Sequence, residues 1–334
     1  MRAMEGKPLH LPKAVTICEE TVGEAFQGEE HFIPTDAKIF LVNGLVNAGF
    51  KYLEVSNFAH PGVIPQFRDV EEVHRRIPRL PGVAYNTPTP NMRALKRAIE
   101  LKKEGIGPDY VSIPQATSDA YCKWMFNKTA EEQWPFIEEA TKVAHDAGLK
   151  VTGIIVCIWA CPWLGTKMPV EKALDFTDRY LSIGVDQISH AQGSRTGLNS
   201  PGPTEVYEYF SRVLDKHPDP KLHSFHFHDN LGFGLAIFLA AMQAGLTHFE
   251  TSMGGLSGMP KLIVDGVPTR GAVDPPEDIM NPPRGGLVST EDFVAMCHSM
   301  GIETGVDLTK ALIVGRWVEK IVGRTLLSYC VRVS

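Results

Sequence analysis

A regular alternation of short apolar runs and longer helical patterns constrains the fold of this chain more than any other feature. Eight runs rich in β-branched residues recur along the sequence: 14–20, 52–58, 82–87, 110–117, 151–159, 185–192, 222–229 and 248–255. Between them, apolar residues recur at three- and four-residue spacing, which is typical of helices that pack one face against a sheet. Eight strand–helix units over about 250 residues predict an α/β fold, the TIM (β/α)8 barrel.

Glycines at the ends of the helical patterns fit this architecture. Ala-Gly or Ile-Gly pairs precede predicted strands at Gly49, Gly148, Gly184 and Gly245. A glycine in this position takes the left-handed conformation that ends a helix. The alternative fold, a doubly wound open sheet, needs a glycine-rich phosphate-binding turn after its first strand. Residues 19–30 do not supply that turn.

The length of the chain fits one large barrel with additions at its end. We expect a single catalytic domain over 1–334, in which the barrel occupies about 14–300 and a C-terminal helical extension occupies 301–334. This division leaves no linker that would separate a second domain.

A stretch rich in glycine and proline, 254–286, follows the eighth predicted strand. A loop of that length is usually a lid, a binding loop or disordered. Helical patterns follow it at 290–300 and 308–322, and we expect both helices to pack under or beside the barrel.

Composition and charge argue against several kinds of partner. The formal net charge is −6 and no basic stripe is visible, which argues against nucleic acid as the main partner. No window reaches the roughly 18 apolar residues of a membrane helix. The first 13 residues lack the apolar core of a secretory signal. Six cysteines without framework spacing, among them Cys157 and Cys161 as expected core thiols, indicate a cytoplasmic protein.

Two histidines stand at the end of the seventh predicted strand. His226 and His228 are two residues apart, so both imidazoles point to one face while Phe225 and Phe227 point to the other. Such a pair is either an unusually polar strand end or a metal site, and imidazole suits Zn, Mn, Fe or Ni. Catalytic residues of a barrel lie at the carboxyl ends of its strands, where this pair is expected.

Carboxylates are predicted at the same end of the barrel. Glu54 and Ser56 share one face of the second strand, and the first strand–helix turn adds Glu19, Glu20 and Glu24. Each acid also has a simpler interpretation, either as a buried structural group or as part of a solvated loop. Their convergence with the two histidines favours a metal centre with open positions for a bidentate substrate.

Several segments together resemble one family, the metal-dependent lyases typified by 3-hydroxy-3-methylglutaryl-CoA lyase. The resemblance covers roughly residues 14–310. It rests on the following segments: "HFHDNLGFGLAIFLAAMQAG", "LEVSNFAHPGVIPQFRDVEEV", "CIWACPWLGTKMP", "GGLSGMP", "GGLVSTEDFVAM" and "MGIETGVDL".

The resemblance implies a TIM barrel that binds a divalent cation, Mg²⁺ or Mn²⁺ with Zn²⁺ as another possibility. It also implies cleavage of a 3-hydroxyacyl-CoA to an acyl-CoA and a keto product. The metal ligands carried over from the family are Glu24, His226 and His228. Glu54 matches an active-site glutamate, and we assign catalytic roles to Glu54, His226 and Arg195.

Four further residues are expected to contact the substrate: Ser56, Gln192, Gly258 and Met259. The partner is expected to be a small molecule, a CoA thioester, without nucleic acid or membrane. By resemblance, the outer helices of such a barrel could pair two chains into a homodimer.

The sequence also departs from the family pattern. Gly23 stands where the family has an arginine that stabilises the enolate, Met259 matches its catalytic cysteine, and Leu287 matches an asparagine ligand. Gln192 stands where an aspartate is expected. The candidates to replace the arginine are Arg195, which is favoured, and Arg270, Arg284 and His31.

These observations lead to one main hypothesis and two alternatives. The main one is a metal-dependent carbon–carbon lyase that acts on a branched 3-hydroxyacyl-CoA other than hydroxymethylglutaryl-CoA. The first alternative is a metal-dependent aldolase or hydrolase that acts on a related hydroxy-carbonyl compound. The second is a barrel that binds a ligand without catalysis, because fold analogy alone does not fix function.

Overall fold

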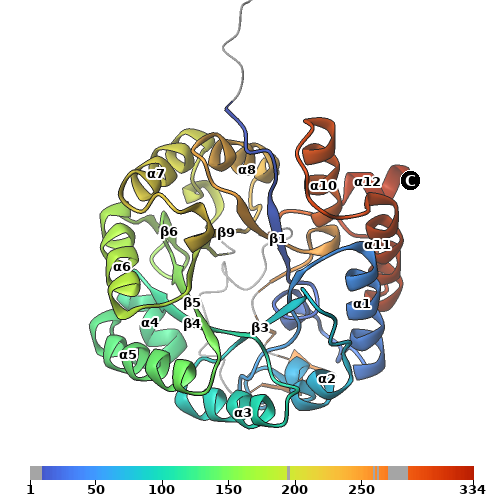
Figure 1. The fold of residues 1–334 in the computed structure, drawn as a ribbon, viewed down its shortest axis with the longest axis horizontal. Helices are drawn as coiled ribbons and strands as arrows, with labels where there is room; N and C mark the ends of the chain where they lie inside the picture. The colour runs from blue at the N-terminus through green and yellow to red at the C-terminus, as the bar shows by residue number, and fades with distance from the viewer. Residues whose placement is uncertain (1–9, 194–195, 259, 262, 270–284) are drawn as a thin grey trace, which may run out of the picture.

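Eight parallel strands close into a barrel in this computed structural model, which describes residues 10–193, 196–258, 260–261, 263–269 and 285–334 (Figure 1). The strands are β1 (Thr16–Glu19), β2 (Tyr52–Glu54), β3 (Ala84–Pro88), β4 (Tyr110–Ala116), β5 (Lys150–Val156), β8 (Gln187–Gln192), β9 (His223–Phe227) and β10 (His248–Thr251). Each overlaps one of the eight predicted runs, so the predicted TIM barrel is confirmed.

Closure of the sheet brings the first and last strands together. β1 pairs in parallel with β2 on one side and with β10 on the other, with Cys18 opposite Tyr52 and Thr16 opposite His248. The open-sheet alternative is therefore wrong. Two short two-stranded ribbons lie outside the barrel sheet: β6 (Ala160–Cys161) with β7 (Thr166–Lys167), and β11 (Ile263–Val264) with β12 (Val267–Pro268).

Helices form an outer ring around the barrel (Figure 1). They are α1 (Thr35–Ala48), α2 (Val70–Arg76), α3 (Met92–Lys103), α4 (Asp119–Phe126), α5 (Ala130–Asp146), α6 (Val170–Ile183), α7 (Pro203–Lys216) and α8 (Gly234–Gln243). Gly49 and Gly184 cap α1 and α6 with φ of 107° and 93°, as the sequence predicts. None of the helices in the described ranges is long and apolar enough to span a membrane.

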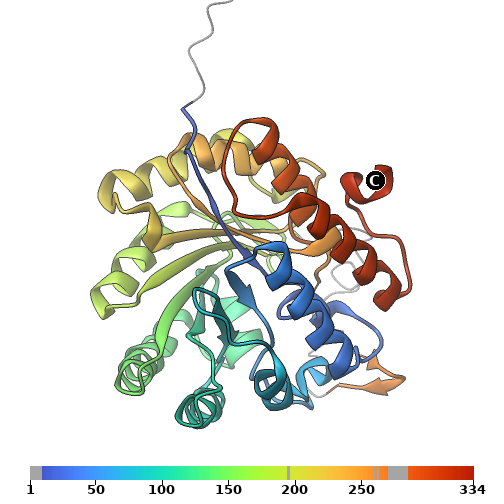
Figure 2. The ribbon, with the colours of Figure 1, turned by 45° about the vertical axis from the view of Figure 1, so that its right-hand side comes forward.

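The C-terminal helices lie beside the barrel, as expected (Figure 2). They are α10 (Thr290–Ser299), α11 (Leu308–Val322) and α12 (Tyr329–Val333). The Trp317 ring on α11 lies 4.5 Å from the Phe40 ring on α1. Gly44 permits this approach, since a Cβ there would lie 2.8 Å from Cζ3 of Trp317.

The segment before α12 reaches the loop that follows β10. The Leu327 amide donates a hydrogen bond to the Gly254 carbonyl at 2.9 Å. The Leu326 side chain packs so closely on Gly254 that a Cβ at residue 254 would lie 2.5 Å from it. Gly254 has a φ of +61°, a conformation that glycine adopts without strain. The end of the chain therefore supports a loop at the carboxyl end of the barrel.

The core lies between the strands and the helices, and Tyr180 of α6 is one of its fully buried aromatic residues. The Trp134 ring of α5 packs against it at 5.1 Å, and the Tyr180 hydroxyl donates to the Ile113 carbonyl of β4 at 2.9 Å. The ring lies directly over Gly153 of β5, where an added Cβ would come within 2.5 Å of it.

We predict that Gly153→Ala lowers the free energy of unfolding by about 1–3 kcal/mol, because overpacking forces the ring or the strand to move. Gly193→Ala is the control, since its Cβ would have Val156 at an ordinary 3.9 Å as its nearest neighbour. Urea unfolding of both variants measures the difference. Equal stabilities would contradict this account of the core.

His74 of α2 is fully buried, with Nε2 3.0 Å from Oγ1 of Thr87. Burial, with a smaller contribution from Arg79, lowers its pKa to about 3. The folded protein therefore holds this imidazole neutral, whereas in the unfolded chain its pKa is about 6.5.

Acid should destabilise the fold through His74. Between pH 6.5 and pH 3 the unfolded chain binds a proton that the folded chain does not, so stability falls as the pH falls. At pH 5 the loss from this one group is about 2 kcal/mol. We predict that the drop in unfolding free energy from pH 7.5 to pH 5 is smaller by this amount in His74→Gln, measured by urea unfolding. An unchanged drop would exclude His74 as a source of acid sensitivity.

Candidate active site

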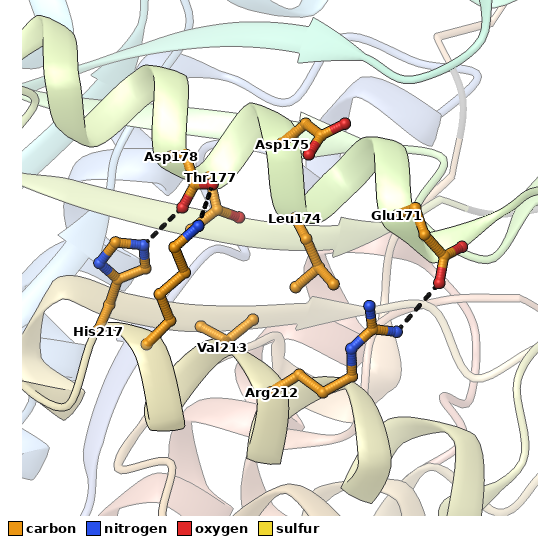
Figure 3. A pocket seen from close by; sticks show the side chains of 9 residues that line it. Glu171, Leu174, Asp175, Thr177, Asp178, Arg212, Val213 and His217 are labelled. Carbon is orange, nitrogen blue, oxygen red and sulfur yellow. Dashed lines mark hydrogen bonds and ion pairs between the residues drawn. The ribbon is translucent and has the colours of Figure 1, made fainter.

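A surface groove of about 280 Å³ lies between α6 and α7 on the outer ring (Figure 3). Charged side chains pair across it: Arg212 Nη1 lies 3.1 Å from Glu171, and His217 Nε2 lies 2.8 Å from Asp178. Because these pairs join the two helices, the groove is better explained as a helix–helix contact than as a catalytic site.

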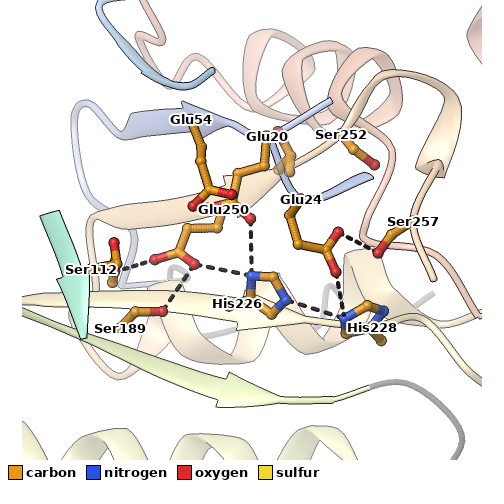
Figure 4. Close-up of polar contacts among 12 residues, drawn as sticks. Glu20, Glu24, Glu54, Ser112, Ser189, His226, His228, Glu250, Ser252 and Ser257 are labelled. Carbon is orange, nitrogen blue, oxygen red and sulfur yellow. Dashed lines mark hydrogen bonds and ion pairs between the residues drawn. The ribbon is translucent and has the colours of Figure 1, made fainter. Parts of the chain in front are cut away.

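The candidate site lies at the carboxyl end of the barrel strands, where His226 and His228 face each other (Figure 4). Their Nε2 atoms are 3.2 Å apart. Phe225 and Phe227 are buried, and the Phe225 ring packs on Phe238 of α8 at 5.5 Å. The strand thus separates its imidazoles from its phenyl rings, as the two-residue spacing predicts.

Glu24 approaches these histidines from the turn after β1. Its Oε1 lies 3.7 Å from Nε2 of His228 and accepts a hydrogen bond from Nε2 of Gln27 at 2.9 Å. Its Oε2 accepts from the Ser257 hydroxyl. One ligand atom each from Glu24, His226 and His228 lie within 4.8 Å of one another, close enough to bind a single ion.

The donor set fits a divalent metal ion. Burial lowers the pKa of His228 to about 3, so its imidazole is neutral at physiological pH, as a metal ligand must be. Its Nδ1 lies 2.9 Å from the Gly285 carbonyl, an acceptor that fixes which ring nitrogen faces Glu24. Two imidazoles and one carboxylate leave positions open for substrate oxygens.

Two more carboxylates contact the other nitrogen of His226 (Figure 4). Nδ1 lies 3.0 Å from Oε2 of Glu20 and 3.1 Å from Oε2 of Glu250. Glu250 also accepts hydrogen bonds from Ser189 at 2.9 Å and from Ser224. Burial, and next the charge of Glu250, raises the pKa of Glu20 to about 8. A carboxylate on the outer nitrogen is the usual way to orient a metal-binding histidine.

Glu54 is buried beside this group, at the end of β2. Its Oε2 accepts from Nδ2 of Asn86 at 3.3 Å, while its Oε1 has no partner among the described residues. Burial, followed by the charge of Glu20, raises its pKa well above the usual value. Ser56 is 1 % exposed and its hydroxyl also lacks a partner in the described part of the chain.

Gly23 makes the position of Glu54 possible. A Cβ at residue 23 would lie 2.4 Å from Cγ of Glu54 and 2.8 Å from its backbone carbonyl carbon. The space beside residue 23 is thus filled by a carboxylate, at the position where the resemblance implies an arginine.

The other predicted substrate contacts have varied surroundings. Gln192 is fully buried, and its Oε1 accepts from the amides of Trp159 and Ala160, both at 3.1 Å. The Gly258 carbonyl accepts from Gln27 at 3.1 Å, which ties the glycine loop to the turn of Glu24.

The other predicted residues fall into two groups. Arg195, Met259, Arg270 and Arg284 lie outside the described residues. His31 has a side chain that is 85 % exposed and 3.5 Å from Asp265, which places it at the surface. Leu287 is buried, and its backbone bridges to that of His228. An apolar side chain therefore occupies the position of the family's asparagine.

Sequence reasoning missed Glu250 and gave Glu20 no separate role. Glu250 follows Phe249 in the eighth barrel strand, so its inward position was available from strand alternation. Its meeting with His226 depends on the register, in which Glu250 lies opposite His226 on the neighbouring strand.

The fold and this cluster define a TIM-barrel enzyme with an imidazole–carboxylate centre at the carboxyl ends of its strands. The family model described as HMGL-like matches residues 14–318. The chain belongs to this HMGL-like family and is accordingly an enzyme of the carbon–carbon lyase class.

The Cys157 and Cys161 thiols, as expected, are free and buried.

Curated relatives match along nearly the whole chain. The mitochondrial hydroxymethylglutaryl-CoA lyase of Bos taurus is 32 % identical over 314 residues, 94 % of this chain and 87 % of the relative. The hydroxymethylglutaryl-CoA lyase YngG of Bacillus subtilis is 29 % identical over 317 residues, 95 % of this chain and 96 % of the relative.

Solved structures agree. The HMG-CoA lyase of Bacillus subtilis has a TM-score of 0.84 at 29 % identity and covers 97 % of this chain and 98 % of its own. An HMG-CoA lyase from Acinetobacter baumannii, solved in complex with coenzyme A and 3-methylmalate, has a TM-score of 0.83 at 25 % identity. It covers 96 % of this chain and 95 % of its own.

We predict that Gly23→Ala and Glu54→Ala interact energetically. The first change alone should lower the free energy of unfolding by about 1–3 kcal/mol because of the overlap with Glu54. In the double variant the overlap with the side chain is gone, so part of this loss should be recovered. Urea unfolding of the four chains gives the coupling energy, expected at about 0.5–3 kcal/mol. Strict additivity would show that residue 23 does not control the position of Glu54.

Proposed function

We propose that this protein is a divalent-metal-dependent lyase that cleaves a carbon–carbon bond in a branched 3-hydroxyacyl-CoA. The observation that carries the proposal is the convergence of Glu24, His226 and His228 at the mouth of a barrel of the HMGL-like family. Mg²⁺ or Mn²⁺ suits this site best, and Zn²⁺ is a further possibility.

A divalent ion bound there supplies Lewis acidity toward the hydroxyl and carbonyl oxygens of a substrate, worth several kcal/mol. The protein provides its orientation: Gln27 and Ser257 fix the Glu24 carboxylate, and Glu20 and Glu250 hold the outer nitrogen of His226. These contacts preorganise the ligands before substrate binds.

Glu54 is proposed as the group that moves the hydroxyl proton. Its Oε1 has no partner in the described residues, and its buried position excludes water that would compete for the proton. His226 is proposed to assist as an oriented imidazole. Arg195 is proposed to supply positive charge to the developing enolate, as predicted from its place after the sixth barrel strand.

The acyl part of the substrate should differ from hydroxymethylglutaryl. Gly23 and Leu287 replace the arginine that stabilises the enolate and an asparagine ligand of the family pattern, and these changes and the altered loops would form a different pocket. Contacts from Ser56, Gln192, Gly258 and Met259 are proposed to shape the altered pocket. The related lyase solved with coenzyme A supports a thioester as the partner.

The cytoplasmic location and the homodimer that the sequence analysis expects remain predictions.

The test is incubation of the purified protein, with Mg²⁺ or Mn²⁺, with a panel of 3-hydroxyacyl-CoA compounds that includes hydroxymethylglutaryl-CoA. We expect acyl-CoA and a keto product from a branched member, detected by liquid chromatography and mass spectrometry. We expect His228→Ala to lower kcat/KM by more than about 100-fold, because the Lewis acidity is worth several kcal/mol.

His298→Ala is the matched control, since His298 lies exposed on α10 and should leave kcat/KM unchanged. Failure of the whole panel to react, with metal shown to be bound, would sink the proposed lyase activity on CoA thioesters.

A further inference from the structure

The active-site end of the barrel contains buried oxygens that the ligand set Glu24, His226 and His228 does not use. Oε1 of Glu54 has no hydrogen-bond partner among the described residues, and the contact that Oε2 of Glu20 makes there is with Nδ1 of His226, at 3.0 Å. The two residues are 3 % and 5 % exposed. A buried carboxylate is costly unless it is paired, hydrogen-bonded or bound to a metal.

These oxygens belong to one group of three acids. In Figure 4 the carboxylates of Glu20, Glu54 and Glu250 point toward one another on the Nδ1 side of His226. Ligand atoms of Glu20, Glu250 and His226 lie within 4.8 Å of one another, a second cluster of metal-binding dimensions. Glu20 directly follows β1, Glu250 lies in β10 and Glu54 in β2, so barrel closure and not local sequence brings the three acids together.

Nearby positive charge is scarce in the described part of the chain. Glu20 and Glu250 form ion pairs there with the single imidazole of His226, and Glu54 forms none. Gly23 contributes no side chain, and Glu54 fills the space beside it. Three carboxylates therefore face one another with one imidazole between them.

We propose that Glu20, Glu54 and Glu250 bind a second divalent cation, distinct from the one held by Glu24, His226 and His228. A site made only of carboxylate oxygens selects a hard ion such as Mg²⁺ or Mn²⁺. With two divalent ions, the four carboxylates of the two clusters are balanced in charge. His226 lies between the ions, with Nε2 facing Glu24 and His228 and Nδ1 facing Glu20 and Glu250.

The second ion would give this centre positive charge beside Glu54, where residue 23 has no side chain. This inference goes beyond the proposed function, because a second cation site is a property of the folded protein whether or not a thioester is cleaved. The readout is therefore metal binding and not activity.

The experiment is titration of the metal-free protein with Mn²⁺, followed by equilibrium dialysis and electron paramagnetic resonance. Wild-type protein should bind two Mn²⁺ per chain, with a spectrum broadened by coupling between two nearby ions. Glu20→Gln/Glu54→Gln should bind one and lose the broadening. Glu24→Gln/His228→Ala should also bind one, at the remaining site.

Glu19→Gln is the matched control. Glu19 is as buried as Glu20 and adjacent to it, but its carboxylate is satisfied by Thr21 and by the Met253 amide at 3.0 Å. This variant should keep both ions, and circular dichroism should show that every variant is folded.

A single ion in the wild type would overturn the second site, as would two ions in Glu20→Gln/Glu54→Gln. Loss of an ion from Glu19→Gln would overturn it as well, because any buried acid would then have the same effect. Two ions in a protein that cleaves no thioester would leave this inference standing and reject the proposed lyase activity, so the two failures are distinguishable.

Discussion

The contact on which this site depends is the sharing of one imidazole between two groups of acids. Nδ1 of His226 faces Glu20 and Glu250. Nε2 of His226 faces His228, and Glu24 lies near both histidines on that side of the ring. Burial would make each carboxylate unfavourable alone, so their coexistence requires a proton or a cation between them. The barrel supplies the rigid frame, because each group stands at the end of a different strand or on the turn that follows it.

Most of the architecture could be predicted from sequence because its signals are local. Alternating apolar runs located all eight barrel strands, and glycines such as Gly49 and Gly184 marked the ends of helices. The spacing of His226 and His228 gave their common face directly. The meeting of Glu250 with His226 was out of reach, since it depends on the register between β9 and β10. Likewise, the sequence indicated that Gly23 lacks a side chain but not that Glu54 fills the space.

Membership of the HMGL-like family sets the class of chemistry. The chain departs from the family pattern at single residues near the candidate site, among them Leu287 and Gln192. The backbone of Leu287 bridges to that of His228, so a buried apolar residue stands at this position of the pattern. Gln192 holds the backbone at Trp159 and Ala160, which gives it a structural task in addition to any contact with substrate. The proposed ligands Glu24, His226 and His228 thus keep the pattern that the resemblance implies, while Gly23 and Leu287 depart from it.

The contact of Leu326 and Leu327 with Gly254 links the last residues of the chain to the loop that follows β10. Further along that loop, Ser257 donates a hydrogen bond to Glu24. A nick or a bulky fusion near residue 326 would therefore act at a distance, loosening the acid that completes the ligand set. Purification handles for this protein belong at the opposite terminus.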